Sequence, residues 1–207
     1  GRQMGIEVTG EVKLGAVRGK LVSAHRSAPL SALMLPLGKK SNNFYAETIF
    51  KSISGMEGKT PASHARSGEL VREALKRAGM PRTGVEVRNG SGLFEGGRLT
   101  ARMLARLLAQ AHGDPGVGPE LRSQLSVAGV DGTLRARMRG HAKSRAVRAK
   151  TGTLAAVSAM SGYATLKGGR TVAFSLLIND VRGKAVAVRK DLDAFVEALI
   201  GAGRPGC

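Results

Sequence analysis

A short run of polar residues, Lys150–Thr153, combines side chains that could hold an acyl substrate. The ammonium group of Lys150 offers a fixed positive charge to a substrate carboxylate, and Thr151 adds a hydroxyl donor. Gly152 has no side chain, so an extended peptide could lie against the backbone here as an added strand. The amide of Thr153 could donate to an oxyanion, a contribution worth roughly a hundredfold or more in rate. A Lys-Thr-Gly triplet alone is a weak signal, and chance is the competing interpretation.

A second polar motif, Ser41-Asn42-Asn43, lies far upstream. In the structural interpretation, Ser41 caps the N-terminus of a helix beside a structural asparagine. In the functional interpretation, the Ser41 hydroxyl relays a proton and the Asn43 amide grips a substrate carbonyl. The motif by itself favours the structural interpretation.

The elements that must position these motifs are helices first and strands later. Apolar residues recur at helical spacing before residue 114, and the Ser-Asn-Asn motif falls at a helix–helix junction. Asn89–Gly92 is a turn cluster, and Thr100 is a predicted helix cap. The predicted helices cover about residues 29–40, 43–54, 67–78 and 100–113.

From residue 146 the pattern changes to the alternation of β-strands. One strand runs through Val147 and Ala149 into Lys150–Thr153, and Gly168-Gly169 predicts a tight hairpin between the next two strands. The remaining predictions are strands at about 156–166 and 171–178, a closing helix at about 185–200, and a short strand at about 6–14.

Composition limits the classes of function. The chain has 207 residues, 42% of them hydrophobic and 23% charged, which is typical of one folded domain rather than a disordered chain. The net charge of +18 would attract polyanions, with simple solubility as the competing interpretation. Aromatic residues make up only 3% and are not interleaved with the basic ones, which argues against a specific nucleic-acid groove.

Metal, cofactor and membrane chemistry are not predicted. The single cysteine, Cys207, excludes a disulfide within the chain, and the four histidines show no paired metal spacing. No apolar run reaches the length of a membrane span. The chain begins without Met or an apolar leader, and we interpret its start as a cut inside a longer protein.

The two polar motifs gain force from their order and surroundings. Phe44–Glu47 follows Ser-Asn-Asn, Asn89–Leu93 stands in the middle, and Val127–Leu134 precedes Ala149–Leu154. From about residue 5 to about residue 179, this succession resembles the D-alanyl-D-alanine carboxypeptidase/endopeptidase family, the class C low-molecular-mass penicillin-binding proteins. Ser-x-Asn and Lys-Thr-Gly are two of the three motifs that mark penicillin-binding proteins.

The resemblance implies hydrolysis of D-Ala-D-Ala bonds or cross-links in peptidoglycan through a covalent acyl-serine. Ser41 would pass a proton to the leaving amine, and Asn43 would hold the substrate amide and a catalytic lysine. Lys150 would bind the substrate carboxylate in a pocket formed with Thr151, Gly152 and Thr153. The expected partners are peptidoglycan stem peptides and β-lactams, with no cofactor and no metal.

Two departures from the family pattern stand out. No serine in the chain has a lysine three residues on, so the Ser-x-x-Lys motif that carries the nucleophile is absent. In the family this motif lies upstream, which predicts a longer enzyme with a signal peptide further upstream and a periplasmic or cell-envelope location; a natural pseudoenzyme is the alternative. The second departure is Asn89, where the family usually has aspartate.

The fold implied by the resemblance is α+β, the penicillin-recognising serine-transferase/β-lactamase-like fold. An antiparallel sheet is covered by helices, with a helical lobe across the cleft, and the first strands and the nucleophile helix are expected to be missing. Residues 1–207 would form the C-terminal portion of a transpeptidase-like domain, with a helical lobe at about 27–145 and strands plus a closing helix at about 146–203. Without the missing helix, the chain should be poorly soluble or loosely packed at the cleft.

Competing functions remain at this point. A catalytically dead module that binds wall peptides or polyanions is the main alternative, and salt-sensitive, sequence-independent nucleic-acid binding is a weaker one. A basic run is expected to form a solvated face, with docking on an anionic wall or membrane surface as the sharper interpretation. The oligomeric state is not predicted. The basic run comprises Arg135, Arg137, Arg139, Lys143, Arg145 and Arg148.

Overall fold

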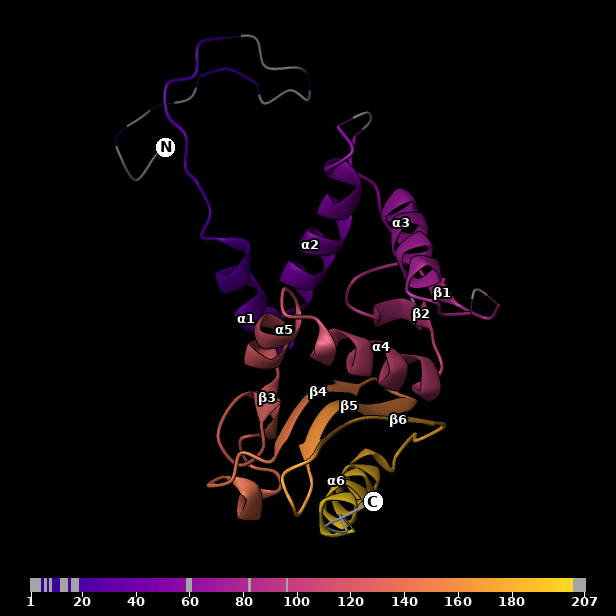
Figure 1. The fold of residues 1–207 in the computed structure, drawn as a ribbon. Coiled ribbons are helices and arrows are strands. Elements are labelled where there is room, and N and C mark those ends of the chain that lie inside the picture. Colours follow the sequence, from indigo (N-terminus) through magenta and orange to yellow (C-terminus); the bar gives the residue numbers. More distant parts are fainter. Residues whose placement is uncertain are drawn as a thin grey trace.

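The computed structural model describes residues 19–58, 61–81, 83–95 and 97–202, together with 5, 7, 9–11 and 15. The strand predicted at 6–14 lies largely outside the described residues. Along the described chain, helices come first, a four-stranded sheet follows and one helix closes the chain (Figure 1).

The predicted helices are confirmed, with small shifts at their ends. The third helix begins earlier than predicted, at His64, because the Ser63 hydroxyl accepts the Arg66 amide and caps it. Thr100 caps the fourth helix as predicted, accepting from the Met103 amide at 3.2 Å. The short fifth helix was not predicted, because it has only seven residues and follows closely on the loop residues Asp114-Pro115-Gly116. The helices are α1 (Leu30–Lys40), α2 (Asn43–Gly55), α3 (His64–Arg77), α4 (Ala101–Gly113) and α5 (Gly118–Gln124).

The main sheet is antiparallel, with strands in the order β3-β4-β5-β6. The predicted hairpin between β5 and β6 is confirmed, and both of its glycines have positive φ, 110° at Gly168 and 90° at Gly169. The three two-residue strands were not predicted, because strands of this length carry no alternation signal. The strands are β3 (Ser126–Val127), β4 (Val147–Thr153), β5 (Val157–Thr165) and β6 (Thr171–Asn179), with β1 (Glu86–Val87) and β2 (Gly97–Arg98) forming a separate pair.

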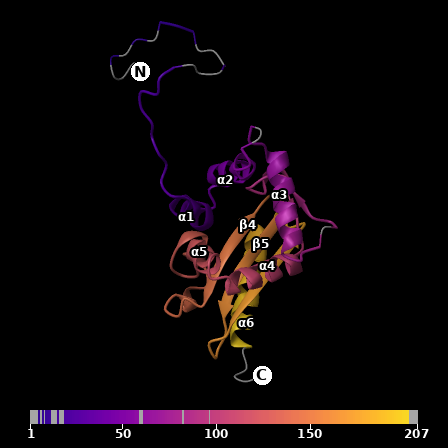
Figure 2. The same cartoon turned by 45° about the horizontal axis from the view of Figure 1, so that its top comes forward.

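Helices cover both faces of the sheet. The closing helix α6 (Ala185–Gly201) packs Leu192 and Val196 against Met160 and Val147 in a fully buried core. On the other face lies α4, whose Leu108 carbonyl accepts the Tyr163 hydroxyl at 2.8 Å. Figures 1 and 2 place α3 beyond α4, with α1 and α5 on the β4 side of the sheet. The range 27–145, expected to form a helical lobe, thus also holds three short strands, of which β3 joins the main sheet.

The register of the sheet decides which β4 side chains lie on the face that α4 covers and which lie on the face that α6 covers. Arg148 pairs with Tyr163, and Lys150 pairs with Ser161, so these residues share the face that α4 covers. Because strand residues alternate between faces, Gly152 also lies on this face. Lys150, the lysine of the Lys-Thr-Gly motif, therefore lies on the α4 face of the sheet, away from α6.

One member of the basic run does not belong to a solvated face. Arg137 donates through Nε and Nη2 to the carboxylate of Asp193 on α6, at 2.8 to 3.1 Å, and its side chain is only 17% exposed. The expectation of a solvated face is wrong for this residue, because helix α6 supplies a carboxylate at that position. The exposed members of the run are Arg135, Arg139, Lys143 and Arg145.

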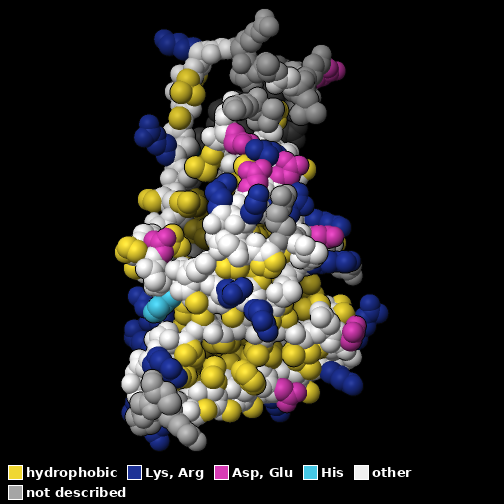
Figure 3. Space-filling view, turned by 45° about the vertical axis from the view of Figure 1, so that its right-hand side comes forward, with side chains coloured by type: hydrophobic (Ala, Val, Ile, Leu, Met, Phe, Trp, Pro, Cys, Tyr) yellow, Lys and Arg dark blue, Asp and Glu magenta, His cyan; other side chains and the backbone are white. Residues whose placement is uncertain are grey.

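The outer edge of the sheet is apolar. Strand β6 is outermost in the described sheet and carries no charged residue from Thr171 to Asn179. Figure 3 shows hydrophobic side chains spread over the lower half of this side of the molecule. An uncharged edge strand of this length is a template for pairing with another strand.

We expect Arg137→Met to lower the free energy of unfolding by about 2 kcal/mol, because Asp193 would stay partly buried without its partner. Arg139→Met, on the exposed part of the same segment, is the matched control and should change stability by less than about 0.5 kcal/mol. Urea unfolding at low protein concentration measures both. Equal losses in the two variants would show that the ion pair contributes nothing.

We also expect the chain alone to associate through its β6 edge. Size-exclusion chromatography should give an apparent mass that rises with protein concentration, and Leu177→Lys on β6 should reduce this rise. A chain that stays monomeric at all concentrations would contradict the expectation of poor solubility.

Candidate active site

A cleft of about 320 Å³ lies where the α1–α2 junction, the turn after β1 and the end of β4 meet. All six residues singled out from the sequence line it: Ser41, Asn43, Lys150, Thr151, Gly152 and Thr153. The remaining lining residues are Leu37, Asn42, Ala46, Gly90, Ser91, Gly92, Leu93, Leu154, Val157 and Ala159.

The Lys150 ammonium joins the two polar motifs. Its Nζ donates to Ser41 Oγ at 2.8 Å and to the Thr151 carbonyl at 2.7 Å. Lys150 and Ser41 are 109 residues apart in sequence. The arrangement places a hydroxyl and an ammonium in contact, which is the geometry that proton transfer requires.

The local backbone leaves the Ser41 hydroxyl available. Asn42, not Ser41, caps α2: its Oδ1 accepts the Tyr45 amide at 3.1 Å. The structural interpretation of Ser41 as a helix cap is therefore wrong. Ser41 instead ends α1 in the left-handed region, with φ 54° and ψ 49°. Such a conformation is costly for serine, and it persists only where the surrounding structure holds it.

The end of helix α1 is held in place by residues 124–131, a segment that includes strand β3. Lys39 Nζ donates to the Leu125 carbonyl at 2.6 Å and pairs with Asp131 Oδ2 at 2.7 Å. Asp131 Oδ1 in turn accepts the Val127 amide at 2.7 Å. Gly38 lies so close to Gln124 that an added Cβ would stand 2.3 Å from its carbonyl oxygen. These contacts bring the end of α1, and with it Ser41, to the β3–β4 edge.

Thr133 is a cleft-side residue that the sequence analysis did not single out. Its hydroxyl accepts the Thr151 hydroxyl at 2.8 Å, and its amide donates to Ser126 Oγ at 3.1 Å. The preceding Gly132 has φ 56° and approaches the Lys39 carbonyl, so an added Cβ would lie 2.6 Å from that oxygen. The Asp-Gly-Thr sequence at 131–133 was the available signal, but it carries no chemistry until the fold places it beside Lys-Thr-Gly.

The second half of β4 offers a free edge. Pairing with β3 stops at Ala149, so among the described strands only β5 pairs with the backbone of Lys150–Thr153. At Gly152 an added Cβ would meet nothing closer than Ala159 Cβ at 3.6 Å. The backbone of this segment is therefore open on one side, and the binding of an extended peptide there stays a prediction.

Burial sets the electrostatics of Lys150. The side chain is half-buried, and none of the ion pairs found among the described residues involves it. Burial disfavours the charged form and lowers the pKa of Lys150 below the ordinary lysine value. Within the described part of the chain, the residue therefore offers an ammonium without a carboxylate partner, and it gives up its proton more readily than an exposed lysine.

Asn89 supports the turn that forms one wall of the cleft. Its Oδ1 accepts the Gly92 amide at 2.9 Å, and its Nδ2 donates to the Leu93 carbonyl at 2.8 Å. An ionised aspartate at this position could accept but not donate. The asparagine thus adds a hydrogen bond within the turn.

Other features of the described chain do not compete with this cleft. A hollow of about 180 Å³ beside α3 is lined by Arg72, Leu75, Pro81 and Val85, which offer one charged group and no nucleophile. No three His, Cys, Asp or Glu side chains gather to hold a metal in the described part of the chain. None of the described helices is long and apolar enough to cross a lipid bilayer.

Solved structures define the class of fold. Over 86% of this chain and 42% of that one, the structure is similar to penicillin-binding protein 4 (DacB) from Haemophilus influenzae in complex with a β-lactam, with a TM-score of 0.76 and 30% identity. The extended-spectrum β-lactamase TLA-1 has the same fold, with a TM-score of 0.64 and 14% identity over 83% of this chain and 63% of that one. The fold is therefore the α+β fold of penicillin-binding proteins and β-lactamases, as predicted.

The family follows from the sequence comparison. The model of the D-Ala-D-Ala carboxypeptidase 3 (S13) family matches residues 2–199, and the chain belongs to this family. It is 38% identical over 197 residues to a D-alanyl-D-alanine carboxypeptidase from an Actinomadura species, covering 90% of this chain and 36% of that protein. The chain spans 36% to 40% of the length of the curated relatives that it matches.

We predict that Lys150 loses its proton at a lower pH than an exposed lysine, whose pKa is about 10.4. Because the unfolded chain binds this proton more tightly than the folded chain does, stability should rise with pH between the two pKa values. NMR titration of the lysine side chains measures the effect, with Lys150→Arg to assign the signal and the urea-unfolded chain as the reference. Titration of Lys150 at the same pH in the folded and the unfolded chain would contradict the prediction.

Proposed function

We propose that this chain is part of a serine-type D-Ala-D-Ala carboxypeptidase or endopeptidase that acts on peptidoglycan peptides. The nucleophilic serine lies in a Ser-x-x-Lys motif outside the chain. The observation that carries the proposal is the 2.8 Å contact between Lys150 Nζ and Ser41 Oγ in a cleft that also exposes a free strand edge. The chain's coverage of 36% to 40% of its curated relatives leaves room for that motif.

Substrate binding uses the end of β4. The stem peptide adds to the free edge of Lys150–Thr153, and its terminal carboxylate meets the Lys150 ammonium and the Thr151 hydroxyl. Asn43, at the first position of α2, donates its amide to a peptide carbonyl. The Thr153 amide donates to the oxygen that becomes an oxyanion during attack.

Ser41 completes the proton transfers. The nucleophilic serine gives its proton to the lysine of its own motif as its oxygen bonds to the carbonyl carbon, and the C–N bond to the terminal D-Ala breaks. The leaving nitrogen takes the Ser41 hydroxyl proton, Lys150 returns a proton to Ser41, and the proton held by the motif lysine replaces the one that Lys150 gave up. The lowered pKa of Lys150 makes the transfer from Lys150 to Ser41 less costly. Water then hydrolyses the acyl-serine and regenerates the nucleophile.

The same cleft would accept β-lactams, which place a carboxylate and a reactive carbonyl in a similar arrangement. This fits the Haemophilus influenzae relative, whose structure contains a β-lactam. Because the substrate belongs to the cell wall, the proposed location is the periplasm or cell envelope. The second candidate is a catalytically dead module that holds wall peptides or polyanions, favoured by the run of exposed cations at Arg135, Arg139, Lys143 and Arg145.

We expect the full-length protein to be labelled by fluorescent penicillin and the chain alone not to be labelled. Within the full-length protein, Ser41→Ala should slow hydrolysis of a D-Ala-D-Ala peptide roughly a hundredfold by removing the proton relay. Lys150→Ala should weaken acylation as well, because it removes both the carboxylate partner and the contact to Ser41. Lys76→Ala, which removes an exposed ammonium on α3, is the control and should be silent.

An unlabelled full-length protein that still binds isolated wall material, with or without Lys150, would favour the binding module. Labelling that is insensitive to Ser41→Ala would remove the proposed role of that hydroxyl.

A further inference from the structure

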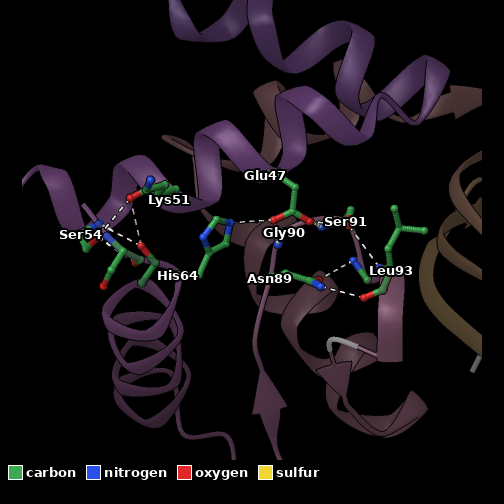
Figure 4. A network of polar contacts seen from close by, with 11 residues as sticks. Glu47, Lys51, Ser54, His64, Asn89, Gly90, Ser91 and Leu93 are labelled. Atoms are coloured by element: carbon green, nitrogen blue, oxygen red, sulfur yellow. Dashed lines mark hydrogen bonds and ion pairs between the residues drawn. The ribbon is translucent and has the colours of Figure 1, made fainter. Parts of the chain in front are cut away.

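A single carboxylate on α2 gathers the polar groups of the turn that lines the cleft (Figure 4). Glu47 lies one helical turn after Asn43. Its Oε1 accepts the Ser91 amide at 3.0 Å and also the Ser91 hydroxyl, and its Oε2 accepts the Gly90 amide at 3.3 Å. His64 Nε2 lies 3.0 Å from the same Oε2. Four polar groups from two other segments thus converge on one side chain.

Glu47 lies behind the cleft rather than in it. The cleft is lined by Asn43 and Ala46 of α2 and by Gly90–Leu93 of the turn, but not by Glu47. The carboxylate therefore connects two walls of the cleft from outside. A substitution that changes the length or the hydrogen bonds of the Glu47 side chain would alter the spacing of those walls. It would not remove a group that a substrate would touch.

The turn transmits this constraint because it has little freedom of its own. The Asn89 side chain holds both Gly92 and Leu93, and Ser91 Oγ accepts the Leu93 amide at 3.2 Å. At Gly90 an added Cβ would stand 2.2 Å from the Ala46 carbonyl oxygen, so the turn lies directly against α2. Residues 89–93 therefore move with the groups that bind Glu47.

Helix α2 is itself supported by α3. The Ser54 amide donates to Ser67 Oγ at 3.1 Å, and Ser54 Oγ bonds the backbone of Ser63 at 2.9 and 3.0 Å (Figure 4). The side chains of Ser54 and Ser67 are fully buried. The His64 ring lies 5.9 Å from the ring of Phe50 on α2. These contacts fix the helix from which Glu47 projects.

The cluster is not a second nucleophilic site. In a Ser-His-carboxylate relay the imidazole stands between the serine and the carboxylate, whereas here the carboxylate stands between Ser91 and His64. Burial opposes ionisation of Glu47, but the hydrogen bonds from Ser91, Gly90 and His64 outweigh it and lower its pKa. The group is thus a permanent anionic acceptor.

We propose that Glu47 is a positioning residue that sets the spacing between the Asn43 end of α2 and the turn 89–93, and thereby the width of the cleft that receives the peptide substrate. This inference rests on the proposed function, because it assigns Glu47 to the same site. A correctly spaced cleft binds the peptide in the ground state and in the transition state alike. Loss of the spacing therefore weakens binding more than it slows the chemical step.

The test compares Glu47→Gln with Glu69→Gln in the full-length protein. Glu69 is an exposed carboxylate on α3 that pairs with Arg66, so its amide variant is a matched control. For a D-Ala-D-Ala peptide we expect Glu47→Gln to raise KM roughly tenfold and to change kcat by less than about threefold. Ser91→Ala should act in the same direction, and adding it to Glu47→Gln should have little further effect because the two groups act as one unit.

Hydrogen–deuterium exchange gives a readout that does not depend on activity. Glu47→Gln should speed exchange of the 89–93 turn, and Glu69→Gln should not. If the full-length protein proves inactive while exchange still responds in this way, the proposed enzymatic function is wrong. The positioning role of Glu47 toward the 89–93 turn is then still supported.

The proposal is overturned if Glu47→Gln leaves KM and exchange at control values, or if its whole loss lies in kcat, as expected for Ser41→Ala. Should Glu47→Gln fail to fold, Ser91→Ala supplies the same comparison, and an unchanged KM and exchange in that variant would be equally decisive.

Discussion

The candidate site depends on the ion pair between Lys39 and Asp131. This pair and the Leu125 carbonyl fasten the last turn of α1 to the segment between β3 and β4. Ser41 follows Lys39 by two residues, and Thr133 follows Asp131 by two. One partly buried contact thus helps to place one hydroxyl against Lys150 and another against Thr151. The close packing of Gly38 on Gln124 holds the same turn, so contacts between distant segments bring the end of this helix to the edge of a sheet strand.

Two residues of the cleft are in energetically unfavourable states that an ordinary surface groove would not contain. Ser41 holds a left-handed backbone, and Lys150 is half-buried with no carboxylate partner among the described residues. Each feature destabilises the chain locally, and each leaves a group ready to meet a substrate. The surrounding contacts, from Lys39 on one side to Glu47 on the other, supply the rigidity that keeps these groups in place.

Much of the fold could be predicted because its signals are local. Caps such as Thr100, apolar residues at helical spacing and the Gly168-Gly169 turn act between residues that are neighbours in sequence. The elements that escaped prediction have weak local signals. Helix α5 has only seven residues, and β3 exists only because β4 pairs with it.

The sequence by itself determined the residue types of the site, the motifs and the family. It did not decide that Asn42 rather than Ser41 caps α2, that Thr133 meets Thr151, or that Glu47 holds the turn at 89–93. Those outcomes belong to the tertiary structure, because each joins a side chain to a group whose position is set by packing between distant segments. Ser41 and Lys150, 109 residues apart, become one site only when α1 docks beside the free edge of β4.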